Sequence, residues 1–166
     1  MKNSLSILFL FLSLSSFGQI SEQKIFNGST YQITYPIEWK LDESGRNRTE
    51  FYLFHSPTVG KFGNNINLMI QNLEGMNLNL DSYTELSQRQ IETNGKLLST
   101  VRKSKNGLEF HEIIFESNYN SIEIRYLQQY YLKNSKAYIL TFTAIKNEYD
   151  NIVPKAKEIF ETFILN

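Results

Sequence analysis

The fold is decided by four extended runs in the second half of the chain, which read LLSTVRKSK (97–105), LEFHEIIFES (108–117), SIEIRYLQQYYLK (121–133) and KAYILTFTA (136–144). Apolar and aromatic residues recur in these runs with the spacing of β-strands. Short polar connections, Asn106-Gly107, 118–120 and Asn134-Ser135, separate them. Asn-Gly is a strong hairpin signal, because both residues tolerate the positive φ of a type I′ turn. The stretch therefore predicts an antiparallel meander.

The faces of these runs predict what covers the meander. In the third run one face carries Ile122, Ile124, Tyr126, Tyr130 and Leu132, and the other carries Glu123, Arg125, Leu127, Gln129, Tyr131 and Lys133. The last run is apolar on both sides, with Tyr138, Leu140 and Phe142 opposite Ala137 and Ile139. A strand buried on both faces needs two covering layers.

Two helices can supply these layers. Helical spacing and a possible N-cap at Asp81 predict a helix from Asp81 to about Thr93, which Asn94 and Gly95 end. An apolar stripe near the C-terminus predicts a second helix through Tyr149, Ile152, Val153, Ala156, Phe160 and Phe163. Because proline is tolerated only in a first turn, Pro154 places the start of regular helix near Val153.

The first half of the chain predicts three further strands. The alternation in 30–35 ends at Pro36, the run 51–55 follows a polar loop at 42–50, and Ile66, Leu68 and Ile70 alternate with polar neighbours. Another loop, 56–64, carries Pro57, Gly60 and Gly63. We expect a single domain over residues 19–166.

Residues 1–18 have the order of a cleavable export signal. Lys2 supplies the positive start, an apolar run extends from Leu5 to Leu14, and small residues stand at Ser16 and Gly18. We expect cleavage after Gly18. The alternative is a membrane anchor, but the run is shorter than the roughly 18 to 20 apolar residues that cross a bilayer. The prediction is a bacterial protein that is periplasmic or extracellular, and soluble after cleavage.

Composition excludes several classes of function. The leader holds one of the 17 Lys and Arg and none of the 17 Asp and Glu, so the remaining chain has 16 against 17 and no basic excess. We therefore expect that the protein does not bind nucleic acid. The chain has no cysteine, which excludes disulfides, thiol nucleophiles, zinc-thiolate sites and a lipidated N-terminal cysteine.

Several short phrases, in this order, resemble the superfamily that contains the PsbP photosystem subunits and periplasmic proteins of the DcrB type. They are Tyr35-Pro36-Ile37-Glu38-Trp39, Phe62-Gly63-Asn64-Asn65-Ile66-Asn67, Leu80-Asp81-Ser82-Tyr83, Gln129-Tyr130-Tyr131-Leu132, Ala137-Tyr138-Ile139-Leu140-Thr141 and 160–165. The resemblance implies an α+β fold, an α/β/α sandwich with a central, mostly antiparallel sheet. It implies an accessory role in an envelope or thylakoid complex, without a shared catalytic apparatus.

The residues that could carry chemistry are few. The two histidines, His55 and His111, have no metal-ligand spacing, and we predict no metal and no cofactor. Glu112, Glu116 and Glu123 could lie near one another across a hairpin, as paired catalytic carboxylates do. A solvated sheet edge is the favoured explanation for them, so no catalytic residue is assigned.

Aromatic residues near the first strands suggest a possible recognition surface. We assign to it Tyr31, Tyr35, Trp39, Phe62 and Asn65. The alternative is that these aromatic residues plug one end of the sandwich, because large aromatic side chains are usually part of a core.

Three functional hypotheses remain. The first is a non-catalytic accessory or binding protein of the bacterial cell envelope that acts through protein–protein contacts. The second is a carrier that holds a small ligand in an internal pocket between sheet and helix and lined by some of the tyrosines. The third is an enzyme that uses the carboxylates. The sequence leaves the partner and the oligomeric state open.

Overall fold

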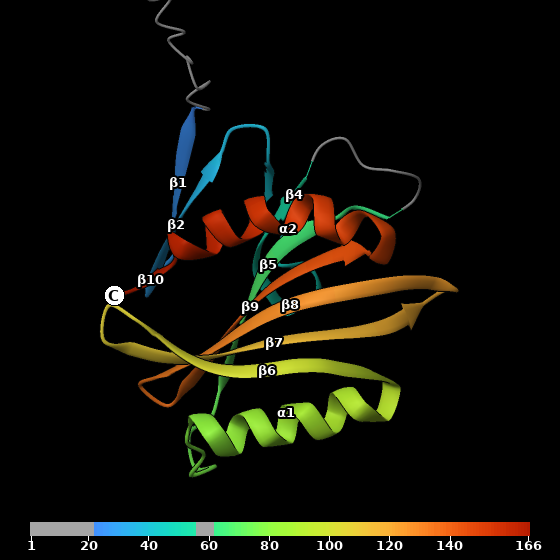
Figure 1. Cartoon of the computed structure of the whole chain (residues 1–166). Helices are drawn as coiled ribbons and strands as arrows, with labels where there is room; N and C mark the ends of the chain where they lie inside the picture. The colour runs from blue at the N-terminus through green and yellow to red at the C-terminus, as the bar shows by residue number, and fades with distance from the viewer. Residues whose placement is uncertain (1–21, 56–61) are drawn as a thin grey trace, which may run out of the picture.

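A computed structural model describes residues 22–55 and 62–166, and the predicted signal at 1–18 lies outside these ranges. The chain folds as one domain in which a curved antiparallel sheet lies between two helices (Figure 1). The seven strands of this sheet run in the order β3-β4-β5-β9-β8-β7-β6. They are β3 (Lys40–Asp42), β4 (Thr49–Phe54), β5 (Asn65–Asn72), β6 (Gly95–Lys105), β7 (Leu108–Tyr119), β8 (Ile122–Lys133) and β9 (Lys136–Ile145).

The meander is confirmed, and its three connections are two-residue turns. Both central residues of each turn have positive φ, as a type I′ turn requires. The central residues are Asn106-Gly107, Asn120-Ser121 and Asn134-Ser135. The predicted connection at 118–120 is therefore one to two residues too early, because β7 continues through Tyr119, which pairs with Ile122. Asparagine takes the first position of every turn, since its short polar side chain tolerates the left-handed region.

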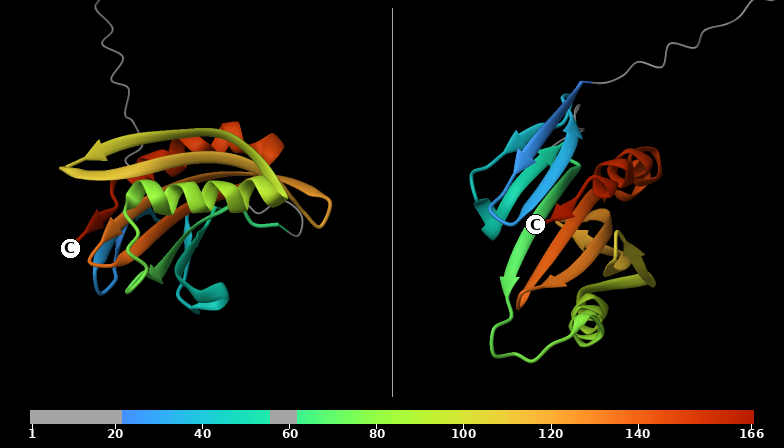
Figure 2. Two further views of the ribbon diagram at one scale, coloured as in Figure 1. Left: turned by 90° about the horizontal axis from the view of Figure 1, so that it is seen from below. Right: turned by 90° about the vertical axis from the view of Figure 1, so that its left-hand side faces the viewer.

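The helices cover opposite faces of the meander, as the strand patterns predict (Figure 2). Helix α1 (Leu80–Asn94) packs on the face that carries Ile113, Tyr130 and Ile139. Helix α2 (Lys146–Glu161) packs on the face that carries Leu127 and Leu140. In the described residues, neither helix has the length and hydropathy needed to span a membrane.

The N-cap of α1 is Asn79, not Asp81. The Asn79 side chain accepts a hydrogen bond from the Ser82 backbone N–H at 2.9 Å, and the Ser82 hydroxyl accepts one from the Asn79 N–H at 3.0 Å. With this reciprocal capping box the helix begins at Leu80, one residue before the predicted start at Asp81. Asp81 lies in the first turn, where a negative charge favours the helix dipole.

The C-terminal helix begins at Lys146, seven residues before the predicted start, and Pro154 lies inside it. The prediction was wrong because it gave the proline more weight than the apolar stripe. Tyr149 and Ile152 are buried only if the helix already exists before Pro154. Pro154 and Asp150 are exposed, so the carbonyl that proline leaves without an N–H faces water.

A second, three-stranded sheet lies beside α2, and no pattern in the sequence predicts it. It has the order β1-β2-β10 and consists of β1 (Gln23–Asn27), β2 (Tyr31–Pro36) and β10 (Ile164–Leu165). Thus the first predicted strand pairs with the extreme C-terminus, through Tyr31 to Leu165 and Gln32 to Ile164. Its buried residues Tyr31, Ile33 and Tyr35 join the core under α2.

The position of Pro154 yields a stability prediction. Replacing Pro154 by Ala should raise the free energy of unfolding by about 1–3 kcal/mol, because the N–H and the helical hydrogen bond are restored. Urea denaturation followed by circular dichroism measures this change. The control Asn151→Ala, at another exposed position of α2, should change stability by less than about 1 kcal/mol. A loss of stability in Pro154→Ala would show that the core needs the proline.

Candidate functional site

The side chains proposed as a recognition surface lie mostly in the core. Tyr31, Tyr35, Trp39 and Asn65 are between 1% and 7% exposed, and Phe62 is partly buried. Tyr31, Tyr35 and Trp39 are at most 3% exposed and therefore offer a partner almost no surface. Tyr31, Tyr35 and Trp39 belong to the main core that α2 covers.

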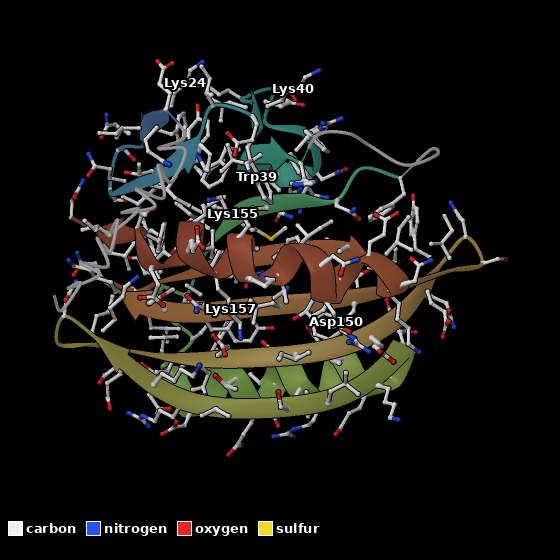
Figure 3. The ribbon with its side chains drawn as sticks, turned by 45° about the horizontal axis from the view of Figure 1, so that its top comes forward. Lys24, Trp39, Lys40, Asp150, Lys155 and Lys157 are labelled. Atoms are coloured by element: carbon white, nitrogen blue, oxygen red, sulfur yellow. The ribbon has the colours of Figure 1, made fainter. Side chains whose placement is uncertain are left out.

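Trp39 has the position of a plug, which is the alternative that the sequence left open. It lies where strands β2 and β4 approach α2 (Figure 3) and is 2% exposed. Its ring meets His55 edge-on, with 5.0 Å between the ring centroids. Burial lowers the pKa of His55, although Glu38 and Glu148 oppose this effect. Both rings thus serve packing, and the histidine is predominantly neutral at pH 7.

The three carboxylates considered for catalysis do not form a site together. Glu112 accepts hydrogen bonds from Lys103 at 2.7 Å and from Gln129 at 3.0 Å. Burial would raise the pKa of Glu112, but these two bonds outweigh burial and lower it. The carboxylate is therefore ionised and paired, whereas a general acid needs a raised pKa.

Glu116 and Glu123 are paired in the same way at the other end of the sheet. Glu116 lies 2.7 Å from Arg125 and 3.2 Å from Lys146, and Glu123 lies 3.1 Å from Lys146. Burial would raise the pKa of Glu116, but hydrogen bonds from Arg125 and Lys146 outweigh burial and lower it. Among the described residues, no group of three His, Cys, Asp or Glu side chains is placed to hold a metal ion.

His111 contacts the first turn of α1. Its Nε2 lies 2.9 Å from the Asp81 carboxylate, which also receives Arg102 at 2.6 Å. Glu112, the next residue on β7, contacts Lys103 on the opposite face of the sheet. The alternation of side chains along a strand thus separates the two groups.

A groove with a volume of about 500 Å³ lies between α1 and the sheet. It exists because α1 packs over β6, β7 and β8, while the corresponding face of β5 and β9 continues beyond the helix (Figure 2). The lining combines neutral polar, aromatic and aliphatic side chains with one glycine. They are Asn67, Gln71, Ser87, Gln90, Asn94, Ser117, Asn118, Gln128, Thr141 and Thr143; Tyr83, Phe115, Tyr126 and Tyr130; Met69, Ile91 and Ile139; and Gly95.

Strand register produces the polar floor of this groove. Asn67 of β5 stands opposite Thr141 of β9, which stands opposite Gln128 of β8. Gln128 Nε2 donates to the Thr141 hydroxyl at 3.0 Å, and the Tyr130 hydroxyl donates to Gln128 Oε1. Asn67 is fixed by a 3.0 Å bond from its amide to Asn65 Oδ1. Asn65 is thus the one predicted recognition residue that supports this floor.

Aromatic rings form the other part of the lining. Phe115 and Tyr126 stack with their planes 7° apart and their centroids 4.4 Å apart. Tyr83 of α1 meets Tyr130 edge-on at 5.5 Å and donates a hydrogen bond to Gln71 Oε1 at 2.8 Å. These contacts hold the rings in place before any ligand arrives.

The described part of the groove is uncharged at neutral pH. The described residues that line it include no Asp, Glu, Lys, Arg or His, and burial raises the pKa of both Tyr83 and Tyr130. These two tyrosines therefore stay protonated. A side chain that exchanges a proton in catalysis needs a pKa near the working pH. The groove is equipped to bind a molecule through hydrogen bonds and ring contacts.

Part of this site was readable from the sequence. The alternation of Asn67, Met69 and Gln71 with buried residues on β5 marks a polar face, and Tyr126 and Tyr130 share one face of β8. No pattern indicates that α1 stops short of β5 and β9. How many strands of the sheet α1 covers is known only from the tertiary structure.

The paired state of Glu112 predicts a pH-dependent loss of stability. Because its folded-state pKa is lowered, its contribution is complete above the unfolded value of about 4.5 and is lost as the pH falls through the folded value. Glu112→Gln should be less stable than the wild type at pH 7, and the difference should narrow at lower pH. Urea denaturation across this range measures it, with Glu92→Gln on α1 as the control for loss of one charge. A difference that does not change with pH would contradict the pairing.

Comparison with known proteins gives structural likeness alone. No family model and no curated protein matches the chain. The solution structure of cyanobacterial PsbP (CyanoP) from Synechocystis sp. PCC 6803 matches with a TM-score of 0.67 at 12% identity, covering 92% of this chain and 99% of that one. LpqN, involved in cell envelope biogenesis of Mycobacterium tuberculosis, matches with a TM-score of 0.66 at 11% identity, covering 87% and 91%.

A third match is PA94, a protein of unknown function from Pseudomonas aeruginosa. Its TM-score is 0.60 at 12% identity, and the match covers 87% of this chain and 97% of that one. All three sequence identities are too low to carry function from one chain to another. The structural matches show the fold alone. The resemblance inferred from the sequence is confirmed at that level: the chain has the PsbP-like fold, an α/β/α sandwich around an antiparallel sheet.

Proposed function

We propose that this protein is a non-catalytic binding protein of the bacterial cell envelope, which residues 1–18 export and which holds an uncharged ligand in the groove between α1 and the sheet. The observation that carries the proposal is the groove's lining, which combines hydrogen-bonding groups and fixed rings with no charged side chain. Such a surface favours recognition over proton transfer.

The structure favours a different hypothesis from the one that the sequence favoured. The sequence favoured contacts with a partner protein, but four of the five side chains assigned to the recognition surface are buried. The groove lies between sheet and helix and is lined by tyrosines, as the carrier hypothesis expects, but it is open, whereas that hypothesis expected an internal pocket. The paired, ionised state of Glu112 and Glu116 argues against the enzyme hypothesis.

The envelope location rests on the sequence of the leader and on the fold. LpqN, one of the proteins with this fold, is described as involved in cell envelope biogenesis. An accessory role of that kind fits a protein that binds without transforming its ligand.

Export can be tested with the leader alone. Fusing residues 1–30 to a reporter enzyme that is active only outside the cytoplasm should give activity, because the apolar run directs secretion. Leu10→Arg should abolish the activity by placing a charge in the middle of that run. Asn3→Lys is the control, since added positive charge before the run is compatible with export. Equal activity from Leu10→Arg would contradict the signal.

Ligand binding can be tested with three probes that share one ring and differ in charge: benzamide, benzoate and benzylammonium. In NMR titrations of the ¹⁵N-labelled protein, benzamide should shift the amides of Gln128, Thr141 and Thr143 most. The two ions should shift them less, because the groove offers no opposite charge to offset their desolvation.

Two tryptophan variants locate the binding. Ser87→Trp places a large ring from α1 into the groove and should abolish the benzamide shifts, whereas Glu85→Trp, on the exposed face of α1, should preserve them. Absence of benzamide shifts at the groove, or stronger shifts with either ion, would contradict the proposed function.

A further inference from the structure

The groove floor retains hydrogen-bonding capacity of both kinds. Gln128 uses one N–H toward Thr141 and one lone pair toward Tyr130, which leaves a donor and an acceptor. Asn67 uses one N–H toward Asn65, which leaves its second N–H and its carbonyl oxygen. The Thr143 hydroxyl has no hydrogen-bond partner within the described part of the chain and lines the groove. Both donors and acceptors are therefore available on the adjacent strands β5, β9 and β8.

This mixture of donors and acceptors matches a ligand rich in hydroxyl groups. Each ligand hydroxyl both donates and accepts, as the floor does, and it carries no charge that would need a partner. A ligand with a carboxylate or an ammonium group would lose its hydration against a neutral lining, which is costly.

The stacked Phe115 and Tyr126 rings, each with one face packed on the other, add aromatic lining beside the polar floor. The face of an aromatic ring is electronegative and favours contact with slightly positive C–H groups. A sugar ring presents C–H groups on its faces and hydroxyls around its rim. A polar floor next to a ring surface therefore fits this combination.

Two other classes of ligand fit less well. An acyl chain would desolvate the amides of Asn67 and Gln128 without giving them hydrogen bonds. An extended peptide usually adds to the free edge of a sheet. Here β5, β9, β8 and β7 are each paired on both sides, so the floor offers no such edge.

We propose that the groove recognises short, uncharged oligosaccharides through Asn67, Gln128, Thr141 and Thr143 of the floor and the Phe115–Tyr126 stack. The inference rests on the proposed function, since it names the ligand class of the same groove. Glycoside hydrolysis generally requires two carboxyl groups that flank the scissile bond, and the groove lining has none. The sugar is therefore bound and not cleaved.

The test is an NMR titration of the ¹⁵N-labelled protein with cellotriose, maltotriose and chitotriose. Trigalacturonate serves as the charged analogue and acetyl-trialanine amide as the neutral peptide. At least one of the neutral trisaccharides should give saturable shifts at Gln128, Thr141 and Thr143. Its dissociation constant should be at least about tenfold lower than those of the two comparison compounds.

Matched variants assign the contacts. Thr143→Val removes a hydroxyl without disturbing a described hydrogen bond, and it should weaken sugar binding about three- to tenfold. Tyr126→Leu removes one ring of the stack and should weaken binding about tenfold, with unchanged spectra outside the groove. Thr34→Val, on β2 of the other sheet, is the control and should bind as the wild type does.

The outcomes separate the two proposals. If benzamide binds in the groove and no trisaccharide does, the sugar inference is overturned and the proposed function stands. Equal or tighter binding of trigalacturonate or the peptide also overturns the inference. If neither benzamide nor any sugar binds in the groove, both proposals fail. Sugar binding that Thr143→Val and Tyr126→Leu leave unchanged places the sugar elsewhere and overturns the inference as well.

Discussion

Burial of β9 on both of its faces is the constraint on which the rest of the structure depends. Eight consecutive residues of this strand, from Ala137 to Ala144, are buried. Such a strand must lie inside the sheet and must be covered from both sides. It accordingly pairs with β5 and β8, and its alternate side chains enter the core under α2 and the smaller core under α1.

The two covers are unequal, and the groove follows from that inequality. On one face α2 is joined by the small sheet β1-β2-β10, and Tyr31, Ile33 and Tyr35 extend the core to β4 and β5. On the other face α1 stands alone. A helix with side chains is about 10 Å wide, whereas strands are spaced by about 4.8 Å. One helix therefore covers only part of a seven-stranded sheet, and polar side chains of β5, β8 and β9 line the groove beside it.

Charged residues are used at the perimeter, which keeps the groove neutral. Arg102 joins β6 to Asp81 at the start of α1, and Arg125 and Lys146 neutralise Glu116 at the opposite end of the sheet. The Lys105 ammonium donates to the carbonyls of Phe160 and Glu161, where the dipole of α2 favours a positive charge. These pairs fix the helices on the sheet. Binding in the groove then depends on hydrogen bonds and ring contacts formed by residues that are already held in place.

The sequence by itself determined the meander, the two-sided burial and the presence of two helices. These features depend on local alternation, on asparagine-rich turns and on apolar stripes, which are properties of neighbours along the chain. It also indicated the polar face of β5 and the paired tyrosines of β8. Only the tertiary structure decided that β2 pairs with the C-terminal residues, that helix α2 continues through Pro154, and that Trp39 and its neighbours are core. It alone left a neutral groove beside α1, because each of these outcomes depends on which distant surfaces meet and on how much of the sheet a single helix can cover.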